Sequence, residues 1–165
     1  MSELKTLFTG KKPLKLAVAE SITCGNLQAR IGKISGASEF FLGGITAYSI
    51  DQKVQHLGVN RVLAEKVNCV SAEVAEQMAI GVCKLFGSDV GCATTGYAEP
   101  SPANQVKEPY AFRAVALRLS DGTYKTEHGL VNLSGKSRMS AQIACAEAAE
   151  QAILTITERA SELHS

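Results

Sequence analysis

The sequence contains no tryptophan, and aromatic residues make up only 5% of its 165 residues. A chain this poor in aromatic side chains offers no platform on which nucleic-acid bases could stack. It also lacks an excess of charge of either sign, because 17 basic residues face 16 acidic ones and give a net charge of +1. Without a basic stripe or a stacking surface, we expect no nucleic-acid partner.

Long hydrophobic runs are also missing. No segment approaches the roughly 20 apolar residues that a membrane span requires. The apolar stretch near the N-terminus is short and is interrupted by Pro13, Lys15 and Glu20, unlike the apolar region of a signal peptide. We therefore expect no membrane contact.

Cysteine is present but in a pattern that indicates little. The five cysteines are an odd number, are widely spaced and include no CxxC pair, which argues against a disulfide framework and gives no sign of a zinc site. They are Cys24, Cys69, Cys83, Cys92 and Cys145. Reduced and mostly buried thiols are typical of cytoplasmic proteins, so we predict a cytoplasmic location.

Hydrophobic residues make up 45% of the sequence, and small apolar side chains dominate among them. The length fits one domain, residues 1–165, with a sizeable core. Hydrophobic periodicity predicts strands, helices and a hairpin around Asp121-Gly122. The expected strands cover 14–20, 41–48, 88–96, 110–120 and 123–133, and the clearest helices cover 23–34, 71–87 and 136 to the end. We predict an α/β protein, a three-layer α/β/α sandwich with a mixed, mainly parallel sheet.

Ligands of such folds bind beyond the carboxyl ends of the parallel strands. Here those ends are Glu20-Ser21, Tyr48-Ser49 and Thr95-Gly96. The loop 97–109 follows the last of them and holds three of the four prolines, and irregular loops of this length are commonly functional. We expect the site at this edge of the sheet.

The turn within "AESITCGNLQAR" (19–30) joins a strand to a helix. It places Thr23, Gly25 and backbone amides at a helix N-terminus, where an anion is favoured. Capping of the helix by Ser21 or Thr23 explains the same residues equally well.

The segment "GASEFFLGGITAYSIDQK" (36–53) sets Ser38 before an apolar run and Tyr48 and Lys53 after it. A serine hydroxyl needs a base to become a nucleophile, and a lysine whose ammonium is desolvated can serve as one. Tyr48 could hold or pass a proton. From the spacing alone, a solvated helical lysine is the favoured interpretation, since lysine is rarely fully buried.

Histidine does not offer a better base. His56 falls in a predicted helix, His128 late in a predicted strand and His164 in the tail. The sequence therefore gives no support for a Ser-His-Asp triad.

Short motifs are spread in order over nearly the whole chain. They are "AES" with "T-x-G" at 19–25, "GAS" at 36–38, "LGG" at 42–44, "AYS" and the lysine at 47–53, "LGV" at 57–59, "VS-x-EVA" at 70–75 and "TG-x-A-x-P" at 95–100. In these motifs the chain resembles the CinA C-terminal domain family, which includes the PncC-type nicotinamide mononucleotide deamidases.

The resemblance implies hydrolysis of the carboxamide of nicotinamide mononucleotide, giving nicotinate mononucleotide and ammonia, without a metal or other cofactor. It implies Ser38 as the nucleophile and Lys53 as its base, with Tyr48 nearby. The substrate-binding residues that it implies are Ser21, Thr23, Gly25, Thr95 and Gly96. It also implies a homo-oligomer with a small-molecule mononucleotide as substrate or ligand.

The sequence departs from the family pattern around the expected substrate. Cys24 replaces a glycine of the turn, Ile50 replaces an asparagine after "YS", and Glu99 stands where the loop usually has a glycine. A glutamate near a phosphate would repel it. Two interpretations follow: an amidohydrolase with an altered substrate cradle, or a catalytically inactive relative that binds a small ligand or assembles with other chains.

Overall fold

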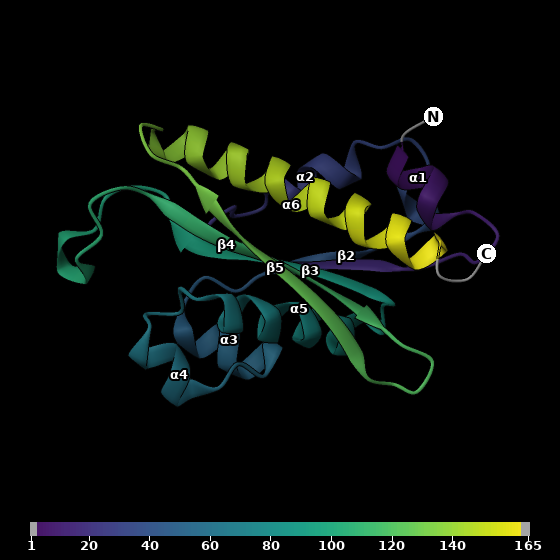
Figure 1. Cartoon of the computed structure of the whole chain (residues 1–165), viewed down its shortest axis with the longest axis horizontal. Helices are drawn as coiled ribbons and strands as arrows, with labels where there is room; N and C mark the ends of the chain where they lie inside the picture. The colour runs from purple at the N-terminus through teal and green to yellow at the C-terminus, as the bar shows by residue number, and fades with distance from the viewer. Residues whose placement is uncertain (1–2, 163–165) are drawn as a thin grey trace.

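The computed structural model describes residues 3–162, with side chains described through residue 159. A five-stranded sheet lies between two layers of helices, with α1, α2 and α6 on one face and α3, α4 and α5 on the other (Figure 1). The strands are β1 (Leu16–Glu20), β2 (Phe41–Thr46), β3 (Val90–Tyr97), β4 (Tyr110–Arg118) and β5 (Tyr124–Asn132). The α-helices are α1 (Glu3–Phe8), α2 (Asn26–Gly32), α3 (Ile50–Leu57), α4 (Arg61–Lys66), α5 (Ala72–Phe86) and α6 (Arg138–Glu162). The three-layer α/β/α prediction is confirmed.

The strands follow the order β2-β1-β3-β4-β5. β1 pairs in parallel with both β2 and β3, whereas β4 and β5 continue the sheet as an antiparallel hairpin. The sheet is therefore mixed, as expected. Its parallel part is the part that brings the carboxyl ends of β1, β2 and β3 together, with β1 in the middle.

Apolar side chains fill both faces of the sheet. Phe8, Leu27 and Ile153 belong to the cluster beneath α1, α2 and α6. Val74, Met78 and Val82, on the apolar stripe of α5, belong to the cluster beneath α3, α4 and α5, whereas Leu85 near the end of that helix is 48% exposed. No helix of the described chain has the length and apolar composition needed to cross a membrane.

Sequence periodicity missed two elements that precede β2, as well as the 3₁₀ turn η2 (Pro102–Asn104) in the loop after β3. The first is α1, which buries Leu4 and Phe8 although it is only 6 residues long. The second is a single 3₁₀ turn, η1 (Ala37–Glu39), directly before β2. Helices this short carry too few turns to display a period, and tertiary packing rather than propensity forms them.

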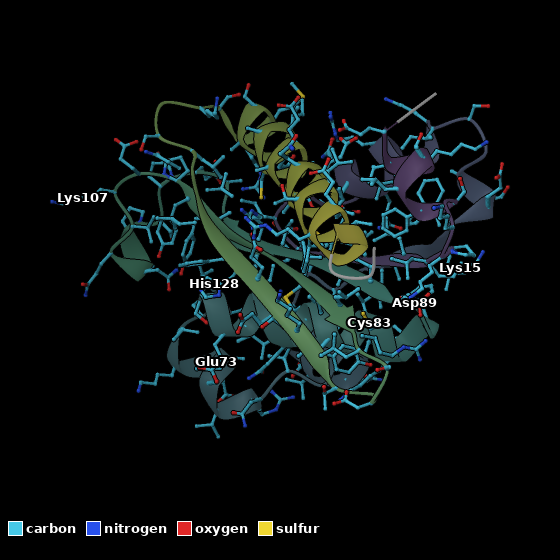
Figure 2. The ribbon with its side chains drawn as sticks, turned by 45° about the vertical axis from the view of Figure 1, so that its right-hand side comes forward. Lys15, Glu73, Cys83, Asp89, Lys107 and His128 are labelled. Carbon is cyan, nitrogen blue, oxygen red and sulfur yellow. The ribbon has the colours of Figure 1, made fainter. Side chains whose placement is uncertain are left out.

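The two ends of the sheet are chemically distinct. At the amino end of β1, the Lys15 amide donates to the Asp89 carboxylate at 2.9 Å and the Lys15 ammonium donates to the Glu39 carbonyl at 2.6 Å. Figure 2 shows Lys15 and Asp89 on one side of the molecule and Lys107, in the loop after β3, on the other. The η1 turn thus lies at the amino end of β1, away from the edge where ligands of such folds bind.

One glycine lets α3 approach α5 closely. A Cβ atom on Gly81 would lie 2.0 Å from the Leu57 carbonyl oxygen, which is backbone and cannot rotate away. Because α3 carries Lys53, this contact also sets the position of that lysine over the sheet.

We predict that Gly81→Ala lowers the free energy of unfolding by about 2 kcal/mol, because the added methyl group forces α3 and α5 apart. For a chain of this size the melting temperature should fall by about 5 °C. Gly32→Ala is the matched control, since a Cβ atom there meets nothing within 4 Å. Equal melting temperatures for the two variants would contradict the prediction.

Candidate functional site

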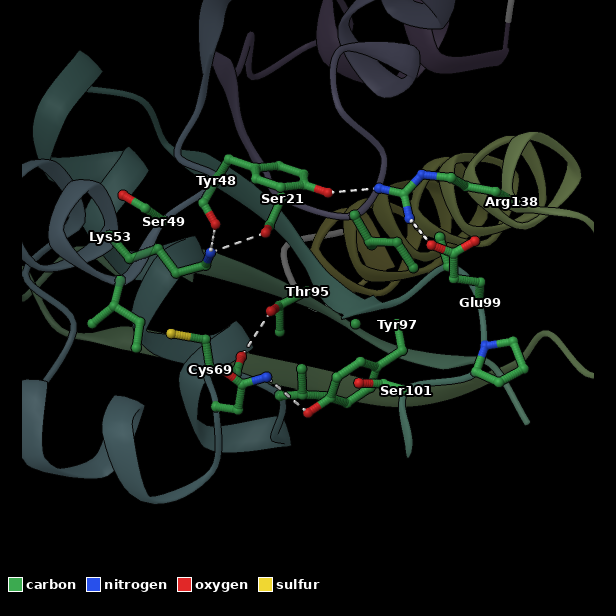
Figure 3. Close-up of a pocket in the computed structure, with 17 residues that line it drawn as sticks. Ser21, Tyr48, Ser49, Lys53, Cys69, Thr95, Tyr97, Glu99, Ser101 and Arg138 are labelled. Carbon is green, nitrogen blue, oxygen red and sulfur yellow. Dashed lines mark hydrogen bonds and ion pairs between the residues drawn. The ribbon is translucent and has the colours of Figure 1, made fainter. Parts of the chain in front are cut away.

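A pocket of about 400 Å³ opens at the carboxyl ends of the three parallel strands (Figure 3). Its wall includes Ser21 after β1, Tyr48 after β2, and Thr95 and Gly96 at the end of β3. A pocket therefore lies at the edge of the sheet where the sequence analysis expects the site.

Lys53 places a buried amine in this pocket. Its helix α3 begins after Ser49, whose hydroxyl accepts a hydrogen bond from the Gln52 amide, and the lysine follows on the first turn. The side chain points inward and is only 2% exposed. Its Nζ lies 2.9 Å from the Ser21 Oγ and 2.8 Å from the Tyr48 carbonyl oxygen.

Burial lowers the pKa of the Lys53 ammonium below its usual 10.5, because the charged form loses its water. The nearby Cys69 raises the same pKa, but by less. Burial in turn raises the pKa of the Cys69 thiol, which favours its neutral form. A neutral Lys53 can donate one N–H to the Tyr48 carbonyl and accept the Ser21 hydroxyl proton with its lone pair.

Ser21 is held at the start of the turn that follows β1. Its amide donates to the Thr94 carbonyl of the neighbouring strand at 3.1 Å, and its side chain is buried beside Lys53. A serine hydroxyl in contact with a desolvated amine has the arrangement of a nucleophile and its base.

The buried carboxylate of Glu20 fixes the rest of this turn. It accepts hydrogen bonds from the Leu27 and Gln28 amides and from the Thr23 hydroxyl, and so caps the start of α2. Thr23 also shares a hydrogen bond of 2.8 Å with the Thr94 hydroxyl. The capping interpretation of the turn is therefore the correct one, although the capping residue is Glu20 rather than Ser21 or Thr23.

Thr23 and Gly25, both predicted to bind substrate, are not among the pocket-lining residues. Thr23 is fully buried, and its hydroxyl is hydrogen-bonded to Glu20 and Thr94. Gly25 adopts a left-handed backbone with φ of 94° at the N-cap of α2. Cys24, with φ of 45°, is exposed and also lies outside the pocket lining. The expectation that this part of the turn lines the ligand pocket is wrong.

The predicted contact between Ser38 and Lys53 is also wrong. Ser38 lies in η1, before β2, and its side chain is exposed. The backbone carbonyl of its neighbour Glu39 accepts a hydrogen bond from the Lys15 ammonium at the amino end of β1, whereas Ser21 follows the carboxyl end of that strand. At about 3.3 Å per residue, the length of β1 alone separates the two positions by about 17 Å. The hydroxyl that contacts Lys53 is that of Ser21.

The other residues predicted at the site do meet there. Thr95 and Gly96 line the pocket, and the Thr95 hydroxyl donates to the Cys69 carbonyl at 2.7 Å. Tyr48 contributes its carbonyl to Lys53 and its ring to the pocket wall. Ile50 also lines the wall, so that the asparagine expected there by resemblance is replaced by an apolar surface.

Two pocket residues that the sequence did not reveal are Asn68 and Cys69, which follow α4. Both have left-handed backbones, with φ of 48° and 61°. Asparagine tolerates this conformation, but in a cysteine it costs about 1–2 kcal/mol of conformational free energy. The conformation presents the Cys69 carbonyl to Thr95 and its thiol side to Lys53. An isolated cysteine gave no signal of this role in the sequence.

Arg138, the first residue of α6, lies at the mouth of the pocket beside Tyr48 and Glu99 (Figure 3). Its Nη1 lies 2.9 Å from Glu99 and its Nη2 donates to the Tyr48 hydroxyl at 2.8 Å. Glu99 thus faces the pocket rather than the solvent alone.

Residues suited to histidine-based or metal-based chemistry are scarce at this pocket. Neither His56 nor His128 is a lining residue; His56 contacts Gln52 and His128 contacts Glu76. His164 lies outside the described residues. Within the described chain, no group of three or more His, Cys, Asp or Glu side chains could hold a metal ion.

The depressed pKa of Lys53 predicts a pH-dependent stability. Between the folded pKa and the unfolded value of about 10.4, the unfolded state binds more protons, so the free energy of unfolding gained from this group rises with pH. It is fully present above about pH 10.4 and lost below the folded pKa. We expect the stability difference between wild type and Lys53→Met to grow in favour of wild type across this window.

Urea unfolding at a series of pH values measures this difference. Lys66→Met, which removes an exposed lysine of α4, is the matched control and should run parallel to wild type. If the free energies of unfolding of wild type and Lys53→Met differ by a constant amount over the whole range, burial does not shift the pKa of this lysine.

The sequence of the chain is similar to those of known proteins. A CinA-like protein of Chlorobium limicola is 40% identical over 124 residues, which cover 74% of this chain and 29% of that protein. The chain spans only 28% and 29% of the lengths of the first two curated relatives that it matches.

Solved structures share the fold over almost the whole chain. A competence-damaged protein (CinA) superfamily protein of Klebsiella pneumoniae has a TM-score of 0.78 at 22% identity, covering 97% of this chain and 94% of that one. The competence/damage inducible protein CihA of Agrobacterium tumefaciens has a TM-score of 0.77 at 24% identity, covering 94% and 93%. The profile of the CinA C-terminal domain matches residues 2–157, nearly the full sequence, and the chain therefore belongs to the CinA C-terminal domain family.

Proposed function

We propose that this protein hydrolyses a small carboxamide with Ser21 as the nucleophile and Lys53 as its base. The observation that carries the proposal is the 2.9 Å contact between the Lys53 Nζ and the Ser21 Oγ, with both side chains buried at the pocket. Desolvation lowers the lysine pKa, which increases the fraction of amine able to accept a proton.

In the first half of the reaction, Ser21 Oγ attacks the carboxamide carbon while its proton moves to Lys53 Nζ. The carbon–nitrogen bond then breaks, and the leaving nitrogen takes that proton and departs as ammonia. Ser21 is left as an acyl ester. The Tyr48 carbonyl keeps one N–H of the lysine engaged, so the lone pair stays directed at Ser21.

In the second half, a water molecule gives a proton to Lys53 and attacks the ester carbon. The ester bond breaks, the proton returns to the Ser21 oxygen, and the carboxylic acid leaves. The sum is amide plus water giving acid plus ammonia, with serine and lysine regenerated.

The family resemblance points to nicotinamide mononucleotide as the amide, converted to nicotinate mononucleotide. A pocket of about 400 Å³ lies within the range typical of small-ligand sites. We also propose, by the same resemblance, a homo-oligomer that works in the cytoplasm. These proposals concern this domain. They apply to the longer relatives only where the additional parts of those proteins leave this pocket unchanged.

A second candidate is a catalytically inactive domain that binds a small ligand or takes part in assembly. The Glu99–Arg138 ion pair favours it, because a phosphate would need the arginine that Glu99 already holds. Turnover measurements separate the two candidates.

We expect Ser21→Ala and Lys53→Met each to lower ammonia release by at least about 1000-fold, since either change removes one half of the nucleophile–base pair. The measurement is ammonia production from nicotinamide mononucleotide and, in parallel, from its phosphate-free ribonucleoside.

Ser38→Ala is the discriminating control, because this exposed serine lies away from the pocket, and it should keep wild-type turnover. Loss of activity in Ser38→Ala with retention in Ser21→Ala would reverse the assignment. Absence of turnover in folded wild-type protein with both substrates would favour the inactive candidate.

The pH profile tests the base directly. We expect kcat/KM to rise with pH as Lys53 loses its proton, with a midpoint below the usual lysine pKa of 10.5. Lys53→Arg should be inactive at every pH, because a guanidinium stays protonated. An activity that is flat with pH, or that survives in Lys53→Arg, would contradict lysine as the base.

A further inference from the structure

Three residues from distant parts of the chain form a hydrogen-bonded cluster at the mouth of the pocket. Arg138 donates through Nη1 to Glu99 at 2.9 Å and through Nη2 to the Tyr48 hydroxyl at 2.8 Å. Figure 3 shows the guanidinium between the two partners, at the opposite end of Tyr48 from the carbonyl that binds Lys53.

This cluster contributes little to stability. The side chains of Arg138 and Glu99 are 48% and 59% exposed, and ion pairs of that exposure add little to the free energy of unfolding. Its effect is instead on the charge that a ligand meets on entering the pocket.

The pocket has little positive charge to offer. Of the described residues that line it, the charged ones are Lys53, Glu99 and Arg138. Arg138 and Glu99 cancel, as +1 and −1, and the proposed reaction needs Lys53 to be neutral. A pocket in this state attracts a phosphate dianion weakly, because phosphate sites rely on unpaired cationic or N–H donors.

A phosphate that bound Arg138 would share the guanidinium with Glu99, which already accepts a hydrogen bond from Nη1. The Glu99 carboxylate would then lie within a few ångströms of the phosphate charges, and such like-charge contacts are a common means of rejecting a ligand. A ligand without the phosphate leaves the pair intact.

We propose that this site selects ribosylated carboxamides without a phosphate monoester over the corresponding mononucleotides, and that Glu99 is the residue that determines this choice. The inference rests on the proposed amidohydrolase function and narrows its substrate from a nucleotide to a neutral or cationic nucleoside amide.

The test compares kcat/KM for ammonia release from nicotinamide riboside and from nicotinamide mononucleotide. Wild type should favour the riboside by about tenfold or more, and Glu99→Gln, which keeps the size and removes the charge, should reduce that ratio by about tenfold. Glu108→Gln is the matched control, since Glu108 is an exposed glutamate of the same loop that does not line the pocket. It should leave the ratio unchanged.

A wild-type preference for the mononucleotide, or a ratio that Glu99→Gln leaves within twofold, would overturn the inference. If wild type releases no ammonia from either compound, the proposed function fails. Binding measurements then test the preference for the riboside over the mononucleotide. Calorimetric dissociation constants of the two compounds for Ser21→Ala, with and without Glu99→Gln, should then show the same preference and the same loss of it. Equal binding of both compounds, or binding of neither, would overturn the inference as well.

Discussion

The burial of one lysine amine is the constraint on which the rest of the site depends. Lys53 is 2% exposed, and its Nζ finds two oxygen partners, one on Ser21 and one on the backbone of Tyr48. A buried amine is tolerated only where such partners meet it. The parallel order of β2, β1 and β3 provides the meeting point, and the close packing of α3 on α5 at Gly81 holds the lysine above it.

Much of the fold could be predicted from the sequence because the long elements repeat a simple period. The apolar stripe of α5 repeats at helical spacing, and β3 is a continuous run of buried residues. Both patterns lie within one short segment of the sequence. The edge of the sheet that holds the pocket followed from the same pattern, because parallel strands share a direction. The short elements α1 and η1 could not be predicted, since contacts distant in sequence stabilise them.

The site was harder to predict because catalysis depends on distance in space. Ser38 and Ser21 both flank apolar strands, and only the sheet topology shows that β1 ends beside Lys53 while η1 lies at the other end. Arg138 follows the pocket's other residues by 37 positions or more, counting from Ser101. Its partnership with Glu99 has no counterpart in any local pattern.

Tyr48 serves the site through two different parts of itself: its carbonyl binds Lys53, and its hydroxyl accepts from Arg138. The first contact belongs to the backbone and every residue type could make it, whereas the second belongs to the side chain alone. Substitution at this position can therefore alter the pocket entrance while the Lys53 amine keeps its backbone acceptor. Such a division lets ligand choice diverge among related chains without loss of the chemical step, which is one physical route by which a single fold acquires new substrates.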